Sequence, residues 1–203
     1  MSTAHARPPD PFAPWAEIVP TIGPVTVDVL LTLPDDGYIY EVVEGVLVRV
    51  AGSGDTATTI AFALGAAIHA HAWPRRLGVV TGADGVYRFP GSETGLIPDV
   101  GYYIAERRAL ISDGDKPLPF APDLAIEVAS PSQTARDMAV KAGRYLSGGT
   151  RLVWVVWPHG EHIDVWRPGR SLASLGPADM LDGEDVIPGF SYPVVEVFAD
   201  PLG

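Results

Sequence analysis

Hydrophobic positions divide the chain into an irregular N-terminal arm and one periodic region. Residues 1–24 show no sustained period and carry six of the twenty prolines. Proline has no amide hydrogen to donate to a helix or a sheet, so we expect a flexible arm there. Residues 25–203 alternate at helix or strand spacing, and 203 residues suffice for one buried core but are too few for two ordinary ones. We therefore predict a single domain after the arm.

Two segments have the spacing of helices. Residues 56–73 are rich in alanine, their apolar residues recur at helical spacing, and Pro74 marks a natural stop. Residues 133–146 carry an apolar stripe typical of an amphipathic helix, which is expected to end at Gly148. Three hydroxyl side chains that could cap the start of this second helix precede or begin it: Ser130, Ser132 and Thr134.

The other periodic segments are typical of strands. YIYEVVEGVLVRV contains two β-rich runs broken at Glu44 and Gly45, which predicts a hairpin. Four short runs follow the first helix: LGVVTG, GVYRF, LIPDVGYYI and PDLAIEVAS. After the second helix, RLVWVVW predicts a strand buried on both faces, HIDVWR completes a hairpin with it, and LASL and DVIPGF are expected to form a further pair. VTVDVLLTL fits a short helix or a short strand. This order predicts an α/β fold.

Composition limits the classes of function. A formal net charge of −11 has the wrong sign for a broad basic surface that holds nucleic acid by its phosphates, unless the arginines gather on one face. The chain has no cysteine, so any metal must be held by oxygen or imidazole. The sequence contains no secretory h-region and no apolar run of about 18 residues, which predicts a cytoplasmic protein with no membrane partner.

Two carboxylates interrupt otherwise apolar strands. Asp99 lies in LIPDVGYYI, and Glu127 lies in PDLAIEVAS on the strand face opposite Leu124 and Ile126. A buried carboxylate must find a cation or change its pKa, and a shared metal would satisfy both groups. Hard divalent ions such as Mg²⁺ prefer oxygen ligands and retain water, so the two carboxylates predict a site that can activate water and polarise a phosphate.

The second helix carries one of the two lysines in the chain, Lys141, among twelve arginines. On a helical wheel it falls beside Tyr145, at the edge of the apolar stripe, so that its ammonium can reach the end of the sheet. A compact ammonium suits the orientation of an attacking water or the stabilisation of a phosphoryl transition state. Spacing alone leaves another interpretation open, in which Asp137 and Lys141 form an exposed i, i+4 pair and the strand carboxylates are ordinary strand-end charges.

These motifs together resemble a known family. PDV at 98–100, PDLAIEVASPS at 122–132, ARDMAVKAGRYL and RLVWVVWP are similar to the Uma-two family, a branch of the PD-(D/E)XK nuclease fold. The hairpin YEVVEG and the ending EDVIPGF with VVEVF extend the resemblance from about residue 25 to residue 198. The resemblance implies a restriction-endonuclease-like core, with a mixed central sheet flanked by helices and additional N- and C-terminal β-hairpins.

The resemblance also implies roles for individual residues. Asp99 and Glu127 would be metal ligands, and Lys141 would be the signature lysine, moved from the strand onto the following helix. Ala129 agrees with this, since it occupies the position two residues after Glu127 where the ordinary motif has lysine. Glu44 of the YEVVEG hairpin is the candidate for an extra carboxylate in the catalytic set, and Glu41 of the same hairpin is the less favoured choice.

The leading hypothesis is therefore an endonuclease that uses Mg²⁺ (or Mn²⁺) to hydrolyse phosphodiester bonds, in DNA, with a homodimer presenting two sites to the two strands. An alternative from another class is a catalytically silent nuclease fold that serves as a binding or regulatory module, which the acidic charge favours. A third possibility is nucleic-acid binding without cleavage, in which case affinity should fall steeply with salt.

Overall fold

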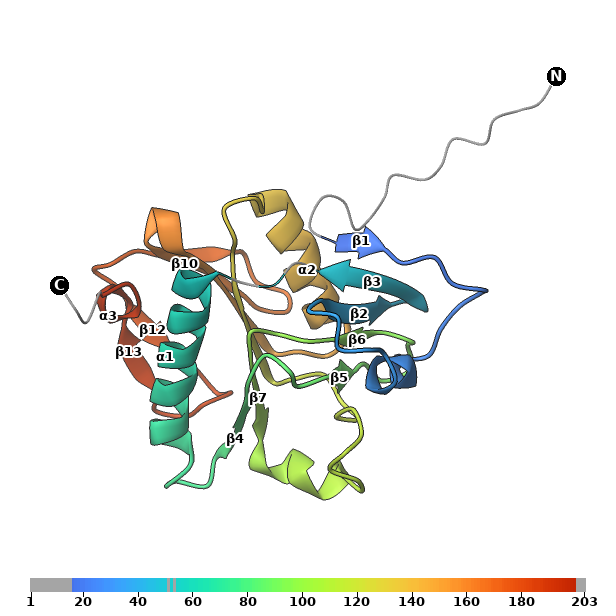
Figure 1. Ribbon diagram of the computed structural model, residues 1–203. Helices are drawn as coiled ribbons and strands as arrows, with labels where there is room; N and C mark the ends of the chain where they lie inside the picture. Colours follow the sequence, from blue (N-terminus) through green and yellow to red (C-terminus); the bar gives the residue numbers. More distant parts are fainter. Residues whose placement is uncertain (1–15, 51, 53, 200–203) are drawn as a thin grey trace.

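The computed structural model describes residues 16–199 except 51 and 53, and in this part of the chain the strands form three sheets (Figure 1). The five-stranded sheet has the order β1 (Ala16–Ile18), β3 (Val46–Val50), β2 (Ile39–Val43), β6 (Gly95–Leu96) and β5 (Tyr87–Arg88). The six-stranded sheet has the order β11 (Ala173–Leu175), β10 (His162–Trp166), β9 (Leu152–Trp157), β8 (Leu124–Val128), β7 (Val100–Ile104) and β4 (Gly78–Thr81). The third sheet pairs β12 (Met180–Asp182) with β13 (Ser191–Pro193).

Three α-helices and three short 3₁₀ helices complete the described part. The α-helices are α1 (Asp55–Ala72), α2 (Ala135–Ser147) and the short α3 (Val194–Val197). The 3₁₀ helices are η1 (Val27–Leu31), η2 (Ala105–Leu110) and η3 (Pro158–Gly160). Both long helices lie where the apolar spacing predicted them, and η1 settles the ambiguous segment VTVDVLLTL as a helical turn.

The predicted β2–β3 hairpin is confirmed. Val43 pairs with Val46, which leaves a two-residue turn at Glu44 and Gly45. Both turn residues have positive φ, 51° and 78°, as a two-residue turn that matches the twist of its strands requires. The turn therefore directs the Glu44 side chain outward, and this residue is exposed.

The six-stranded sheet contains one parallel pair, β8 with β9, and α2 is the connection between these two strands. All five residues of β8 and the first five of β9 are buried, which confirms the prediction of strands covered on both faces. Register pairs Glu127 with Val155 of β9, and Ile126 with Val100 of β7 on the other side. Both carboxylate-bearing segments thus meet around the end of β8.

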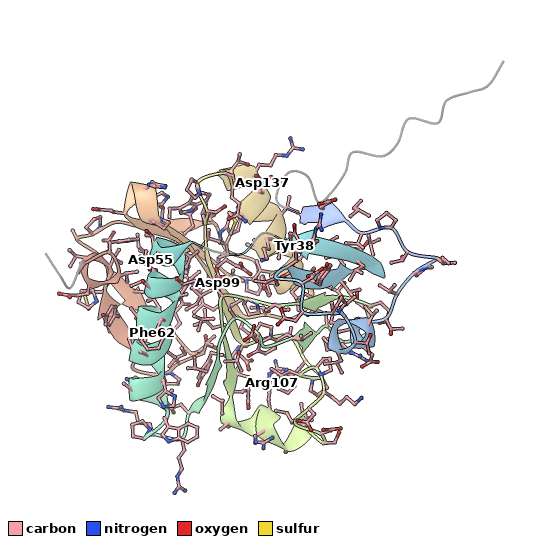
Figure 2. The ribbon with its side chains drawn as sticks, in the orientation of Figure 1. Tyr38, Asp55, Phe62, Asp99, Arg107 and Asp137 are labelled. Carbon is pink, nitrogen blue, oxygen red and sulfur yellow. The ribbon has the colours of Figure 1, made fainter. Side chains whose placement is uncertain are left out.

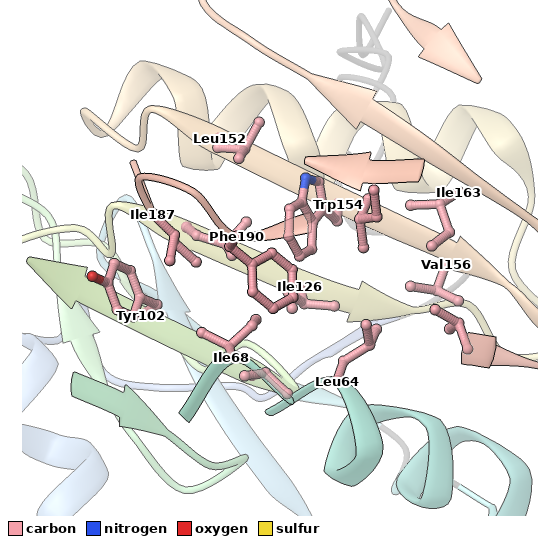
Figure 3. Close-up of a cluster of buried hydrophobic side chains, with 14 of the residues drawn as sticks. Leu64, Ile68, Tyr102, Ile126, Leu152, Trp154, Val156, Ile163, Ile187 and Phe190 are labelled. Atoms are coloured by element: carbon pink, nitrogen blue, oxygen red, sulfur yellow. The ribbon is translucent and has the colours of Figure 1, made fainter. Parts of the chain in front are cut away.

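Each face of the six-stranded sheet has its own hydrophobic core. In the first core, Leu64 and Ile68 of α1 and Phe190 of the C-terminal segment cover strand side chains that include Ile126 and Trp154 (Figure 3). In the second core, α2 and the five-stranded sheet cover the opposite face, with Val43, Leu96, Met138, Tyr145 and Val155. Figure 1 shows this arrangement, with α1 on one side of the six-stranded sheet and α2 with the five-stranded sheet on the other.

Two sequence predictions about the ends of the domain need correction. The strand Ala173–Leu175 pairs with β10 and not with DVIPGF, which forms the turns between β12 and β13. The apolar residues of DVIPGF are buried as a loop, because Pro188 cannot donate to a sheet and Gly189 has a φ of 75°. Within the predicted arm, Ala16–Ile18 forms β1 and pairs with β3, whereas residues 1–15 lie outside the described part.

No helix of the described chain combines the length and the apolar character needed to cross a membrane.

The start of α2 is held by a capping box. The Thr134 hydroxyl accepts the Asp137 amide at 3.3 Å, and the Asp137 carboxylate accepts the Thr134 amide at 2.8 Å. We expect Thr134→Ala to lower the free energy of unfolding by ~1 kcal/mol, because the free amides at the helix start lose an acceptor. Urea unfolding measures this loss. Ser132→Ala, at an exposed position in the same loop, is the control, and an equal loss in both variants would contradict the role of the cap.

Candidate functional site

Glu127 lies near the C-terminal end of β8 and points to the face that α2 covers. Its strand neighbours Leu124, Ile126 and Val128 belong to the first core, whereas Ala125 and Ala129 belong to the second. Alternation along β8 therefore directs the Glu127 side chain into the second core, as the sequence predicted. The residue is only 5% exposed, so its carboxylate needs partners from the protein.

Two side chains of α2 bind the two oxygens of this carboxylate. Lys141 Nζ donates to Glu127 Oε2 at 2.9 Å, and the Tyr145 hydroxyl donates to Glu127 Oε1 at 2.7 Å. Lys141 and Tyr145 are four residues apart, so they lie one above the other on the buried face of the helix. Because β8, α2 and β9 follow one another, the parallel crossover brings this helix over the strand that carries Glu127.

Asp99 lies where the chain passes from the five-stranded to the six-stranded sheet. The run that the sequence predicted as one strand is divided, with β6 ending at Leu96 and β7 beginning at Val100. Asp99 Oδ2 accepts the amide of Val128 at 2.7 Å, which fixes it beside the end of β8. Asp99 is partly exposed, and Figure 2 shows it at the centre of the molecule.

The hairpin contributes Glu41 to this cluster, and not Glu44. Glu41 in β2 is fully buried, and its Oε1 lies 3.5 Å from Lys141 Nζ and accepts the Ile97 amide at 3.1 Å. Glu44 occupies the exposed turn and makes no ion pair with Lys141 among the described residues. Position in the hairpin explains this difference. Glu41 and Val43 are two residues apart and share the inner face of β2, whereas Glu44 lies at the tip of the hairpin.

The competing interpretation of an exposed Asp137–Lys141 pair does not describe this site. Asp137 turns back to the amide and hydroxyl of Thr134, and Lys141 is only 7% exposed. The ammonium instead lies between Glu127 and Glu41 and joins α2 to both sheets.

Burial and charge together set the protonation of the cluster. Burial raises the pKa of Glu127 to about 8, with added repulsion from Asp99 and Glu41 and an opposing attraction from Lys141. Burial also raises the pKa of Asp99, against the effects of Lys141 and the Val128 amide. Burial by itself would lower the pKa of Lys141, but the surrounding carboxylates outweigh this and raise it, so the lysine stays protonated.

The cluster opens into a pocket of about 330 Å³. Asp99, Glu127 and Lys141 all line it, together with the loop that follows β8 and includes Ser130 and Gln133. Water and a small anionic group can therefore reach the charged atoms from one side, while the protein encloses the other.

The carboxylate oxygens of the cluster are suitable ligands for a hard divalent cation. Asp99 uses only Oδ2 for the Val128 amide, and Glu41 Oε2 is buried with no hydrogen-bond partner in the described structure. Carboxylate oxygens of this kind are ligands that Mg²⁺ and Mn²⁺ accept. However, no three acidic or histidine side chains in the described residues are arranged so as to surround an ion. Asp99 and Glu127 would therefore hold an ion together with water.

Comparison with known proteins gives the family. Residues 27–195 match the family model Uma2, described as "Putative restriction endonuclease". The chain belongs to the Uma2 family. The match spans most of the described residues and includes all the side chains of the cluster.

A solved structure resembles this Uma2 chain across nearly its whole domain. It is described as the crystal structure of a putative nuclease belonging to DUF820 from Anabaena variabilis ATCC 29413. The two chains are 20% identical, with a TM-score of 0.73, and the similarity covers 86% of this chain and 98% of the other. No curated protein matches the chain. The fold is thereby confirmed as the restriction-endonuclease-like α/β arrangement that the motifs implied.

Two members of this Uma2 cluster have signals in the sequence that the apolar pattern hides. Tyr145 belongs to the apolar stripe of α2, but its position four residues after Lys141 places both side chains at the same strand end. Glu41 lies within a strand and can face the core, whereas Glu44 lies in a two-residue turn and is exposed.

The buried Lys141 should stabilise the fold in a pH-dependent way. In Lys141→Met the attraction that lowers the pKa of Glu127 is lost, so at pH 9 the fold must hold either an uncompensated charge or a proton against the pH, and we expect a loss of up to ~3–5 kcal/mol in the free energy of unfolding. The loss should be smaller at pH 6, because Glu127, with a folded pKa of about 8, is then largely protonated and carries no charge to compensate.

Denaturant unfolding at both pH values measures this difference. Lys116→Met, which removes the other lysine at an exposed position, is the matched control and should change stability little at either pH. A loss in Lys141→Met that is the same at pH 6 and pH 9 would contradict the coupling to Glu127.

Proposed function

We propose that this protein is a metal-dependent endonuclease that hydrolyses phosphodiester bonds in DNA. The observation that carries the proposal is the meeting of Asp99, Glu127 and Lys141 at one pocket, where two carboxylates and an ammonium come together from three segments of the chain. Membership of a family described as "Putative restriction endonuclease", and a fold shared with a chain described as "a putative nuclease", support the same class of reaction.

Each residue has a distinct part in this proposal. Asp99 and Glu127 would hold Mg²⁺ or Mn²⁺, which when bound supplies positive charge to the phosphate and acidifies a coordinated water. Lys141 orients the attacking water and stabilises the negative charge that develops on the phosphate. The Val128 amide and the Tyr145 hydroxyl fix the two carboxylates in place. Glu41 holds the ammonium from the other sheet, so that Lys141 keeps its charge within the cluster.

Cleavage should require Lys141. We expect purified wild type to cut plasmid DNA in Mg²⁺ or Mn²⁺ and to be inactive in EDTA. Lys141→Met should reduce the rate by a factor on the order of 10²–10³, since a group that stabilises the transition state is lost. Lys116→Met is the control, and the temperature of the assay is chosen so that circular dichroism shows all proteins folded. Equal cleavage by wild type and Lys141→Met would reject the assignment.

Metal affinity should depend on Asp99 and on pH. Glu127 must release its proton before it binds an ion, so affinity for Mg²⁺ should increase about tenfold per pH unit from pH 6 to about 8 and then level off. Titration calorimetry at several pH values measures this increase. Asp99→Asn should abolish binding, while Asp115→Asn, at an exposed position, should leave it unchanged. Affinity that is independent of pH would argue against Glu127 as a ligand.

A second candidate is a catalytically silent nuclease fold that acts as a binding or regulatory module. One observation favours it, namely that both oxygens of Glu127 are already bound by Lys141 and Tyr145. Wild type that neither binds Mg²⁺ or Mn²⁺ nor cuts DNA would support this candidate. The homodimer expected from the sequence stays a prediction, which light scattering on the purified protein can test.

A further inference from the structure

A second, larger hollow adjoins the candidate site. Its volume is about 620 Å³, within the range of ~300–1,000 Å³ common for sites that bind small organic groups. It lies between one side of α1 and strand β4, and Asp99 and Val100 line it at the start of β7. Ile39, Ala83 and Asp99 line both this hollow and the pocket of the candidate site. A ligand group at Asp99 can therefore extend directly into the larger hollow, which we call the α1 cavity.

The walls of the α1 cavity suit a flat, apolar ring and not a phosphate. None of the described residues that line it is lysine or arginine, so the cavity has no side chain of this kind to pair with an anionic group. Ala66 on α1 has a small side chain and Gly65 has none, so the helix approaches β4 and β7 closely there, and a Cβ at Gly65 would lie 3.5 Å from the Val100 side chain. Phe62, one turn earlier, is 78% exposed at the cavity, although burying an aromatic ring is favourable (Figure 2).

Polar side chains at the edge of the α1 cavity can form hydrogen bonds with a ligand. The side chains of Thr58, Thr81 and His69 all line it. The Thr81 hydroxyl lies 2.8 Å from the Tyr87 hydroxyl, and the Thr58 hydroxyl donates to backbone carbonyls of its own helix, so each oxygen can still accept a hydrogen bond. A nucleobase combines a planar apolar face with donors and acceptors at its edge, and it matches this arrangement.

The net charge of the protein also favours recognition of a base over contacts to phosphates. Five arginines in the described part form ion pairs with acidic side chains: Arg49, Arg88, Arg107, Arg151 and Arg167. With a net charge of −11, the surface gains little from counterion release along a duplex. Stacking of bases on aromatic side chains provides affinity that does not depend on phosphate contacts, and it is the usual way that proteins bind single strands.

We infer that the α1 cavity binds an unstacked nucleobase of the strand whose phosphodiester lies at Asp99, with Phe62 as the stacking platform. This inference rests on the proposed function, and it adds that the substrate is single-stranded or locally unpaired. A base within a duplex is stacked on its neighbours and must be withdrawn at an energetic cost before it can enter the cavity. Single-stranded DNA is therefore bound more tightly than the duplex of the same sequence.

The test compares binding of three fluorescein-labelled probes by the full-length protein. The probes are a short oligothymidylate, its duplex with oligoadenylate, and an abasic oligonucleotide of the same length. Anisotropy is measured in Ca²⁺, and a denaturing gel verifies that each probe stays intact. Phe62→Ala should weaken binding of the oligothymidylate at least about fivefold and leave the abasic probe unchanged, because only the base stacks on the ring. Leu110→Ala, which removes an exposed apolar side chain from η2, is the matched control.

Three outcomes of these measurements would overturn the inference. Equal affinities of wild type and Phe62→Ala for oligothymidylate overturn it, as does an equal loss with the abasic probe. Light scattering that shows a wild-type dimer and a Phe62→Ala monomer, with oligothymidylate binding unchanged, assigns the cavity to self-association instead and also overturns it.

Cleavage kinetics separate the base site from the chemistry. Phe62→Ala should raise KM for single-stranded substrate with little change in kcat, whereas Lys141→Met should lower kcat. Base-dependent binding by a wild type that cuts no DNA would refute the proposed hydrolysis and keep the base site. If Lys141→Met abolishes cleavage and Phe62→Ala leaves KM unchanged, the proposed hydrolysis is supported and the base site is refuted.

Discussion

The ammonium of Lys141 joins three parts of the molecule. It extends from α2, donates to Glu127 on the six-stranded sheet, and lies 3.5 Å from Glu41 on the five-stranded sheet. Without this charge, two carboxylates would be buried among apolar side chains at a cost of several kcal/mol each. A hydrophobic arrangement could fill the same space, and buried charged clusters with shifted pKa values are common at functional sites.

The crossover, the helix cap and the segment between β6 and β7 bring the residues of this cluster together. The parallel crossover from β8 through α2 to β9 returns the helix over the strand that precedes it. The capping box at Thr134 fixes where α2 begins, and the helical period then places Lys141 and Tyr145 over the end of β8. On the other side, the short segment between β6 and β7 links the sheets, because the Ile97 amide binds Glu41 and Asp99 binds the Val128 amide.

Negative charge shapes what the site can recognise. The arginines that the sequence left free to form a basic face are in several cases committed to ion pairs, as Arg107 is with the buried Asp123. Among the described residues that line the pocket, Lys141 is the one lysine or arginine. For the proposed activity on nucleic acid, a protein of this composition needs contacts that do not depend on phosphate charge, and the apolar hollow that shares Asp99 with the pocket can provide them.

The sequence by itself determined the long helices, the β2–β3 hairpin, the buried strands and the residues Asp99, Glu127 and Lys141, because periodicity and interrupted apolar runs are local properties. It also indicated the family through its ordered motifs. Only the tertiary structure decided that Glu41 and not Glu44 joins the cluster, that Tyr145 holds Glu127, and that β11 pairs with β10. The physical reason is that strand pairing and helix placement depend on contacts between segments far apart in the chain, which local patterns do not encode.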